Sequence, residues 1–161
     1  MPFQTADLCD EHGDKLQVAE PVFRDYGGRA AFCGPIKTVR ACEDNSRVRE
    51  ALEEPGEASV LVVDGAGSLR CAMLGDQLAA LAHQNGWQGI VIYGAIRDSV
   101  EIATIDVGVK ALATNPRRSA KRGEGTRDIP VSFAGVRFVP GSYLYADQDG
   151  IVVSSEPLNG D

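Results

Sequence analysis

The order of the predicted elements indicates an α/β fold, a mixed sandwich with a barrel-like β part. Three observations support this class: a helix and strands come first, strands and helices alternate in the middle, and two antiparallel hairpins follow. At 161 residues the chain has the length of one domain with one core. We therefore expect residues 1–161 to form a single domain.

The elements before residue 59 are marked by turn and capping residues. They are, in order, a helix over 5–12 with Thr5 as its N-cap, a strand over 16–23, a strand over 31–42 entered through Gly34-Pro35, and a helix after Asp44, Asn45 or Ser46. Next comes the apolar run SVLVVD over 59–64, which is typical of a strand covered on both faces. The Gly-rich turn over 65–68 lacks the full spacing of a nucleotide-binding fingerprint.

The central stretch over 74–101 organises the chain. Its apolar residues recur at helical spacing after Asp76, which predicts a helix that Gly86 ends. A buried strand is expected over 89–93, and its end delivers Arg97 and Asp98. A helix N-terminus and a strand C-terminus should therefore meet, which is a favourable place for a small anion.

The remaining elements complete the sheet. They are a helix from Asp98 to about Ile105, a strand over 107–114, a hairpin over 131–139, and a second hairpin over 143–153. The second hairpin turns through Asp147 to Gly150. Its two aspartates could be metal ligands, but turn chemistry explains them more simply.

Composition narrows the function classes. The chain is 43% hydrophobic and 24% charged, with a formal net charge of −7, which argues against direct nucleic-acid binding and suits a basic protein partner. Without a long apolar run or a signal-like start we expect no membrane association and a cytoplasmic location. One loop is locally basic, although Glu124 and Asp128 partly offset its charge, and it is either solvated or a recruitment surface. Its basic residues are Arg117, Arg118, Lys121, Arg122 and Arg127.

The cysteines and histidines do not indicate a zinc site. The four cysteines are widely spaced, and we expect them to be reduced and packed. The two histidines form no ligand pattern, so any metal should be a hard cation on oxygen ligands.

Four charged residues are candidates for chemistry. Asp76 and Arg97 are separated by twenty residues, enough for a helix, a turn and a strand to bring them together, and Asp98 and Glu101 would share a helix face. A guanidinium matches a carboxylate substrate, and an adjacent aspartate can hold Mg²⁺ or Mn²⁺. The alternative from spacing alone is an Arg97–Asp98 salt bridge at a helix start, with Asp76 as an N-cap.

The same residues carry a family resemblance. Gly75-Asp76, twenty residues, Arg97-Asp98, two residues and Glu101 resemble the signature of the class II 4-hydroxy-4-methyl-2-oxoglutarate aldolases and the related regulator of ribonuclease activity A (RraA) proteins. The resemblance runs almost end to end, through VFRDYGGR, FCGPIKTV, LVVDGAGSLR and YADQDGIVVS. It places the chain with the short, RraA-like branch.

This resemblance implies a β/β/α swivelling-type sandwich and a ring-shaped homotrimer with sites at subunit boundaries. Arg97 and the backbone N–H groups of Gly75, Asp76, Gln77 and Leu78 would bind the carboxylate of a small α-keto acid. Asp98 would hold a divalent metal, Mg²⁺ or Mn²⁺, largely through water. Asp76 would position a water that moves protons at C3 of the pyruvyl unit.

The implied reaction is retro-aldol cleavage of 4-hydroxy-4-methyl-2-oxoglutarate to two pyruvates through an enolate. Decarboxylation of oxaloacetate through the same enolate is the expected side activity. The chain departs from the aldolase pattern at Ala72, where a glycine is expected, and it ends at Asp161, without the extension that brings an acidic residue to a neighbouring subunit. Glu101 is the substitute acid that we expect.

The resemblance also implies a second function, as a regulator that binds and masks a ribonuclease E-like endonuclease. The acidic charge suits contact with arginine-rich segments. Asp98, which some regulators of this branch lose, is present here and favours a working metal site. A methyltransferase label attached to this family has no S-adenosylmethionine-binding signature to support it.

Overall fold

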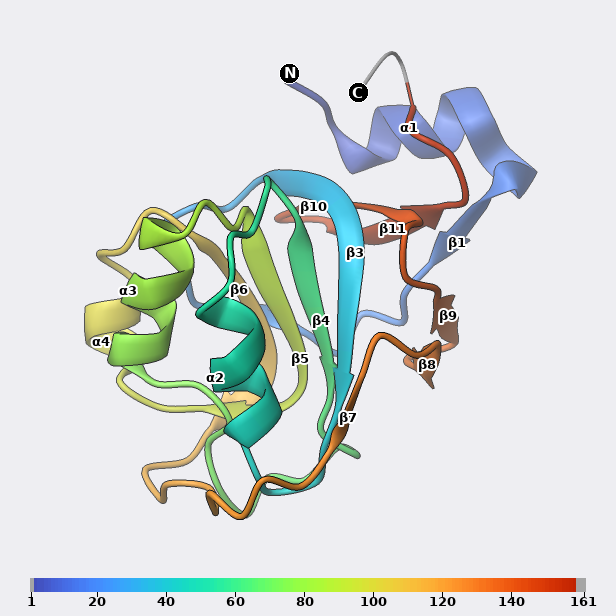
Figure 1. Cartoon of the computed structure of the whole chain (residues 1–161). Helices are drawn as coiled ribbons and strands as arrows, with labels where there is room; N and C mark the ends of the chain where they lie inside the picture. Colours follow the sequence, from blue (N-terminus) through green and yellow to red (C-terminus); the bar gives the residue numbers. More distant parts are fainter. Residues whose placement is uncertain (1, 159–161) are drawn as a thin grey trace.

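The computed structural model describes residues 2–158 and is organised around one large mixed sheet (Figure 1). The strand order in this sheet is β1-β11-β10-β3-β4-β5-β6-β2, and β7 pairs with β3. The strands are β1 (Leu16–Val18), β2 (Arg24–Asp25), β3 (Phe32–Arg40), β4 (Val60–Asp64), β5 (Gly89–Ile96), β6 (Gly108–Thr114), β7 (Thr126–Arg127), β8 (Val131–Phe133), β9 (Val136–Phe138), β10 (Tyr143–Asp147) and β11 (Gly150–Ser154). The helices are α1 (Thr5–His12), the 3-10 helix η1 (Gly13–Lys15), α2 (Ser46–Leu52), α3 (Asp76–Gln84) and α4 (Ser99–Ile102).

The predicted mixed α/β fold is confirmed, but its barrel-like part is not. Among residues 2–158 the strand order is an open path with β1 and β2 at its ends, and β8 pairs only with β9. Strand β3 joins the two parts of the sheet. Its first half pairs antiparallel with β10, and its second half, from Ile36, pairs parallel with β4. Gly34-Pro35 therefore lies inside this strand rather than at its entry.

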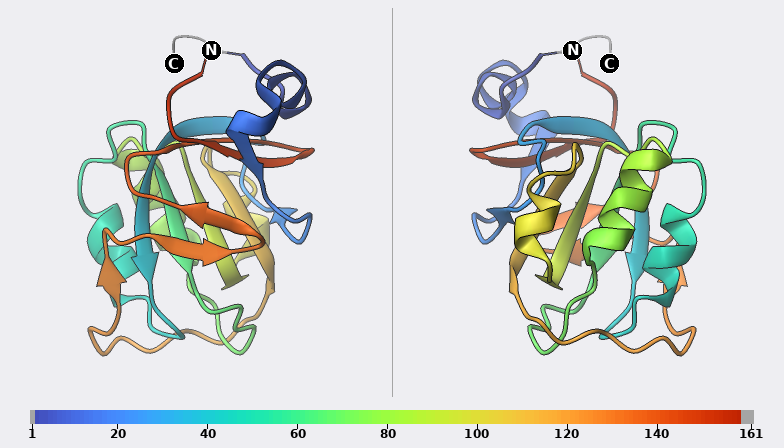
Figure 2. Two further views of the ribbon diagram at one scale, coloured as in Figure 1. Left: turned by 90° about the vertical axis from the view of Figure 1, so that its right-hand side faces the viewer. Right: turned by 90° about the vertical axis from the view of Figure 1, so that its left-hand side faces the viewer.

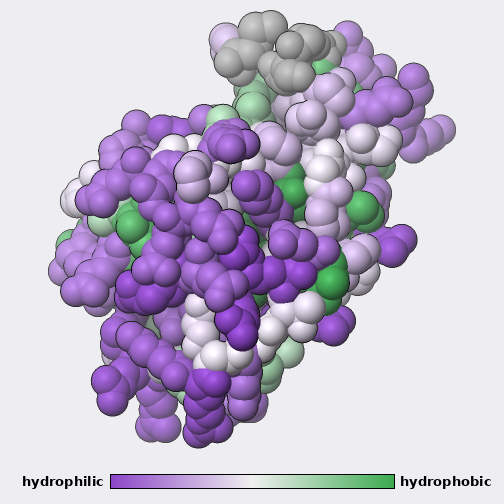
Figure 3. Space-filling view, viewed as in Figure 1, coloured by the Kyte–Doolittle hydropathy of each residue, from purple (hydrophilic) through white to green (hydrophobic). Residues whose placement is uncertain are grey.

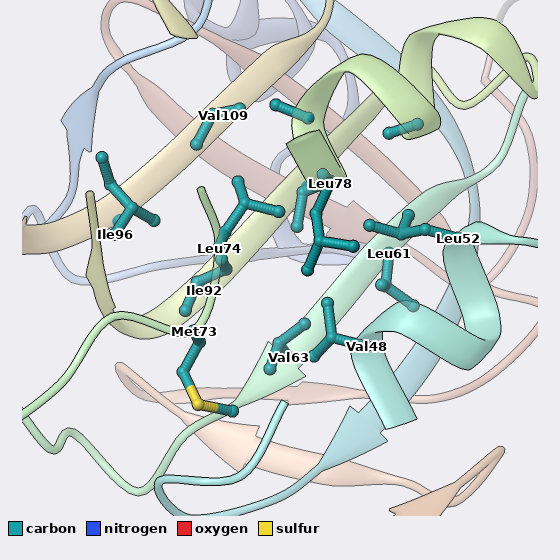
Figure 4. Close-up of a cluster of buried hydrophobic side chains, with 14 of the residues drawn as sticks. Val48, Leu52, Leu61, Val63, Met73, Leu74, Leu78, Ile92, Ile96 and Val109 are labelled. Atoms are coloured by element: carbon teal, nitrogen blue, oxygen red, sulfur yellow. The ribbon is translucent and has the colours of Figure 1, made fainter. Parts of the chain in front are cut away.

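The helices α2, α3 and α4 cover one face of the parallel strands β3 to β6, and the β8–β9 hairpin lies across the other (Figure 2). The two faces of β4 show why its sequence is apolar throughout. Leu61 and Val63 pack toward the helices, near Leu78 (Figure 4), whereas Val60 and Val62 pack in the cluster that includes the hairpin. The four apolar side chains of β4 are fully buried, and each contributes about 1.5–3 kcal/mol to stability. The predicted two-sided burial is confirmed.

The hairpin face is filled by aromatic rings. Tyr93 of β5 stacks on Phe133 with ring centroids 4.8 Å apart, and Phe133 stacks on Phe138 at 4.5 Å. The outer surface over the helices is mainly hydrophilic in Figure 3. None of the helices within residues 2–158 has the length and apolar character that a membrane crossing requires.

The helix α1 is anchored by a contact across the whole chain. Thr5 is not an N-cap as predicted, because Gln4 holds that position and Thr5 is the first helical residue. The Thr5 N–H and hydroxyl donate to the Asp147 carboxylate at 2.8 and 2.7 Å. Asp147 also accepts the N–H of Asp149 at 3.0 Å, which confirms the turn interpretation of these two aspartates.

Several element boundaries differ from the prediction. The strand expected over 16–23 ends at Val18, and the strand expected over 89–93 continues to Ile96, with a register shift after Ile92. The helix expected to reach Ile105 is one turn long and ends at Ile102. Within residues 2–158 the four cysteines form no disulfide, as expected, but Cys42 is exposed rather than packed.

Candidate active site

The start of α3 lies beside the end of β5, as the sequence predicts. The segment before α3 runs along β5 and is held by backbone hydrogen bonds. Met73 N–H donates to the Ala95 carbonyl at 2.8 Å, and Arg97 N–H donates to the Leu74 carbonyl at 2.9 Å. Ala72, at the position where the aldolase pattern has glycine, forms a parallel bridge with Ala95. These bonds bring residues 75–76 to residues 97–98.

Asp98 joins the two segments. Its carboxylate oxygen Oδ2 accepts the N–H of Asp76 at 3.0 Å, which satisfies one of the free donors at the start of α3. Asp98 adopts the left-handed conformation, with φ 58° and ψ 41°, which is costly for a residue other than glycine and is common at functional sites. A Cβ atom on Gly75 would lie 2.8 Å from that oxygen and 3.4 Å from Arg97 Nε, so the close approach requires glycine here.

The simpler structural alternative is wrong in both parts. Asp76 is the first residue of α3, and Gly75 is the N-cap. Among the residues that the structure describes, the Arg97 guanidinium has no ion pair and no hydrogen bond, with Asp98 or with any other group. The arginine is therefore available to a ligand.

A cavity of about 130 Å³ opens at this junction. Its size suits a small organic acid, since pockets for larger ligands are typically several hundred Å³. The lining residues are Asn45, Arg49, Ala72, Gly75, Asp76, Gln77, Leu78, Arg97, Asp98, Arg118, Ser119 and Lys121. Six of the predicted site residues thus meet in one cavity. Glu101 is the exception, because it is exposed on α4 and does not line the cavity.

The N–H groups at the start of α3 are only partly free. The N–H of Asp76 is already occupied by Asp98, so it cannot also bind a substrate in this arrangement. The N–H groups of Gln77 and Leu78 have no hydrogen-bond partner within residues 2–158. These two donors and the helix dipole favour an anion at the cavity.

The sequence did not predict that part of the basic loop reaches the site. Arg118 forms a parallel bridge with Ala72, and Ala72 N–H donates to the Arg117 carbonyl at 2.7 Å. Ala120 bridges to Asp44 on the other side of the loop. Arg118, Ser119 and Lys121 consequently line the cavity. The predicted solvation of the loop is confirmed at Arg117, Arg118, Lys121 and Arg122, whose side chains are exposed. The run of basic residues was the available sequence signal. It has no helical or strand periodicity that would indicate which part of the fold the loop contacts.

The buried Asp44 carboxylate holds this loop in position. It is fully buried and accepts the N–H groups of Ser46 and Arg122 at 2.9 and 2.7 Å. Burial acts to raise the pKa of Asp44, but these hydrogen bonds, together with one from Glu124, outweigh it and hold the pKa below its usual value. Asp44 therefore stays ionised and fixes the basic loop against the start of α2.

The cavity is more positive than the rest of the protein. It is lined by four cations, Arg49, Arg97, Arg118 and Lys121, and by two carboxylates, a formal balance of +2 in a chain of −7. None of the four cations has an ion-pair partner within residues 2–158. Arg127 of the same loop differs, because it pairs with Glu50 and Glu54 outside the cavity.

The Gly-rich turn over 65–68 offers no cradle for a phosphate. The N–H groups of Gly65 and Gly67 both donate to the Tyr93 carbonyl at 3.1 Å. Ala66 N–H donates to the Asp64 carboxylate, and Ser68 N–H donates to the Gly65 carbonyl. All four donors are used internally, which agrees with the weak nucleotide signal in the sequence.

Comparison with known proteins supports the predicted family. Residues 5–153 match the RraA-like family, described as Aldolase/RraA. A protein from Alkalilimnicola ehrlichii named "Putative 4-hydroxy-4-methyl-2-oxoglutarate aldolase" is 60% identical over 98% of both chains. A protein of the same name from Laribacter hongkongensis is 58% identical over 98% of this chain and 99% of its own.

Two solved structures share the fold. One is named as an S-adenosylmethionine:2-dimethylmenaquinone methyltransferase from Geobacillus kaustophilus, with 52% identity, a TM-score of 0.95 and 99% of both chains covered. The other, the "RNA-processing inhibitor RraA from Thermus thermophilis", has 46% identity and a TM-score of 0.95, with 99% of this chain and 97% of the other covered. The chain belongs to the RraA-like family.

Proposed function

We propose that this protein is a divalent-metal-dependent lyase that cleaves 4-hydroxy-4-methyl-2-oxoglutarate into two molecules of pyruvate. The observation that carries the proposal is the cavity in which an unpaired Arg97 and free N–H groups of α3 lie beside the carboxylates of Asp76 and Asp98. The names of the relatives at 58–60% identity support this substrate.

The binding end of the site consists of Arg97 and the N–H groups of Gln77 and Leu78. The guanidinium presents several donors in a plane that matches a carboxylate, and it has no competing partner among the described residues. Together these groups would hold the carboxylate next to the keto group of the substrate. Their fixed positions on a strand end and a helix start would orient the bond to be broken.

Asp76 is the proton-handling group in this proposal. Its carboxylate lines the cavity, while its N–H holds Asp98 in place. When the C3–C4 bond breaks, the C4 hydroxyl loses its proton to a water held by Asp76 and C4 becomes the keto carbon of one pyruvate. The other pyruvate leaves as an enolate, which must gain a proton at C3. Asp76 would position the water that delivers this proton. Oxaloacetate decarboxylation leaves the same enolate, so we propose it as a side activity.

The residues present fit a hard divalent cation. Mg²⁺ is usually held by one or two carboxylates and keeps several waters or substrate oxygens as ligands. Asp98 would supply such a carboxylate at the cavity. Among residues 2–158 no group of three or more acidic, histidine or cysteine side chains could hold a metal ion, so the other ligands would be waters and substrate oxygens. When bound, the cation would stabilise negative charge on the keto oxygen of the substrate.

The direct test is the stoichiometry of the reaction. Purified protein with Mg²⁺ or Mn²⁺ should release two pyruvates per 4-hydroxy-4-methyl-2-oxoglutarate and one per oxaloacetate, measured with lactate dehydrogenase. The Arg97→Gln variant should bind pyruvate at least about tenfold more weakly, because it loses a charge-assisted contact. A folded protein that releases no pyruvate from either acid would contradict the proposal.

A second function is favoured by one observation, the RNA-processing inhibitor at 46% identity with the same fold. The net charge of −7 would suit contact with an arginine-rich segment of a ribonuclease E-like protein. Binding to such a segment, measured by calorimetry, tests this candidate separately from lyase activity. The homotrimer and the cytoplasmic location stay part of the proposal, and light scattering of the purified protein tests the trimer.

A further inference from the structure

The wall of the cavity formed by Arg118, Ser119 and Lys121 has no role in the proposed reaction so far. Its two cations lack ion-pair partners within residues 2–158. Ser119 is 5% exposed, and its hydroxyl oxygen is buried without a hydrogen-bond partner among the described residues. A buried hydroxyl without a partner is costly, so this one requires an explanation.

We propose that this wall is a second anion subsite, which binds the distal carboxylate of a dicarboxylate substrate and so determines specificity. The inference rests on the proposed lyase function, because Arg97 is taken to hold the carboxylate next to the keto group. A distal carboxylate would pair with Arg118 and Lys121, and it would accept a hydrogen bond from Ser119. Monocarboxylate 2-oxo acids would leave the buried Ser119 hydroxyl without a partner and would gain nothing from the exposed Arg118 and Lys121.

The charge distribution favours a ligand over a purely structural role. Acidic residues outnumber basic ones, 23 to 16, and other arginines of this chain find acidic partners, for example Arg29 with Asp106 and Arg47 with Glu50. Arg118 and Lys121 instead line one cavity with Arg97 and have no acidic partner within residues 2–158. Their side chains are exposed, so water screens their mutual repulsion, and their combined charge favours an anion in the cavity. Arg49 of α2 also lines the cavity and adds to the same positive charge.

The subsite is fixed by the backbone on both sides. Before it, the Arg117 carbonyl accepts the N–H of Ala72 at 2.7 Å. After it, Ala120 N–H donates to the Glu43 carbonyl at 2.9 Å, and Arg122 N–H donates to the Asp44 carboxylate at 2.7 Å. A loop held in this way positions its side chains before a ligand arrives, which reduces the entropic cost of binding.

A second pocket also contacts Arg97 and Asp98, so the distal carboxylate could in principle point into either pocket. It is lined by Thr114, Asn115 and Pro116 in addition to that pair. It has no cation other than Arg97, so it cannot neutralise a second carboxylate. The distal carboxylate is therefore directed toward the wall of Arg118 to Lys121.

The test compares acids that differ only at the distal end. Cleavage of 4-hydroxy-4-methyl-2-oxoglutarate is compared with cleavage of 4-hydroxy-2-oxopentanoate, which has hydrogen in place of the distal carboxylate. In parallel, calorimetry with Mg²⁺ compares binding of 2-oxoglutarate and 2-oxohexanoate. The variants are Arg118→Gln, Lys121→Gln, the double variant and Ser119→Ala. Arg117→Gln is the matched control, because it removes the same charge from the same loop outside the cavity lining.

We expect the wild type to prefer the dicarboxylate in both comparisons. Each single charge variant should reduce this preference about threefold to tenfold, and the double variant by at least about tenfold. Arg117→Gln should leave it unchanged. An unchanged preference in the double variant would overturn the subsite even if the lyase is active. If the double variant loses the binding preference but the wild type cleaves neither substrate, the subsite is supported and the lyase function is rejected. If the wild type binds neither acid, the subsite and the lyase function are both rejected.

Discussion

Replacing Gly75 by alanine is the sharpest test of how the site is built. The added Cβ would lie 2.8 Å from Asp98 Oδ2 and 3.4 Å from Arg97 Nε, so the carboxylate must move by several tenths of an ångström. Such a move breaks or lengthens its 3.0 Å bond to the N–H of Asp76. Because a shift of about 1 Å at a reacting group can cost about 10²-fold, we expect kcat/KM to fall about 10–100-fold.

The loss of stability should not exceed the loss of activity, which at 10–100-fold corresponds to about 1.4–2.7 kcal/mol. The N-cap dihedrals, φ −124° and ψ −170°, are accessible to alanine, which gains about 0.4–1 kcal/mol by restricting the unfolded chain. Loss of the Asp98 hydrogen bond costs about 1–3 kcal/mol. Urea unfolding should therefore show a net loss of at most about 2.6 kcal/mol. Gly94→Ala is the control, because its Cβ would meet nothing closer than 3.4 Å. Full pyruvate release by Gly75→Ala would refute this reasoning.

Three further predictions concern the rest of the fold. Burial acts to raise the pKa of Asp147, but the hydrogen bonds that its carboxylate accepts outweigh burial and lower the pKa. At pH values above about 4, the unfolded-state pKa, Asp147→Asn should therefore lower the free energy of unfolding by about 1–3 kcal/mol, and the difference from wild type should shrink as the pH falls further. Urea titrations of both proteins at pH 7 and pH 3 measure this difference. Burial raises the pKa of the Cys71 thiol and shields it, whereas Cys42 is exposed. Iodoacetamide at pH 7.5 should therefore label Cys42 before Cys71, as followed by mass spectrometry, and equal labelling rates would contradict this. Leu61→Ala should cost about 2–5 kcal/mol of unfolding free energy by leaving a cavity, whereas Val100→Ala, at a side chain 77% exposed, should cost under about 0.5 kcal/mol.

The parts of the fold that depend on local pattern could be predicted from the sequence. The apolar run of β4 indicated burial on both faces, and the helical spacing after Asp76 indicated α3. The twenty residues between Asp76 and Arg97 were enough to predict that the two ends meet, because helix and strand lengths are fixed by their geometry. Local rules thus predicted that Asp76, Arg97 and Asp98 meet at the cavity, whereas Gly75, Gln77 and Leu78 were implied by the family resemblance.

The rest of the cavity depends on contacts between distant segments. Arg118 reaches the cavity through a bridge to Ala72, and nothing in the loop sequence indicates this partner. Thr5 was expected to cap its own helix, whereas its partner Asp147 is 142 residues away. Capping preference is a local tendency, and a buried carboxylate with several donors outweighs it.

The most direct test of the lyase proposal is the release of pyruvate from 4-hydroxy-4-methyl-2-oxoglutarate, with Mg²⁺ or Mn²⁺ and with a chelator, by wild type, Asp98→Ala and Asp98→Asn. Asparagine retains an oxygen that can accept the Asp76 N–H, so it separates the positioning of α3 from the negative charge. We predict metal-dependent turnover in the wild type that both variants lose. Equal turnover with the chelator, or turnover retained in Asp98→Asn, would contradict a metal held by Asp98.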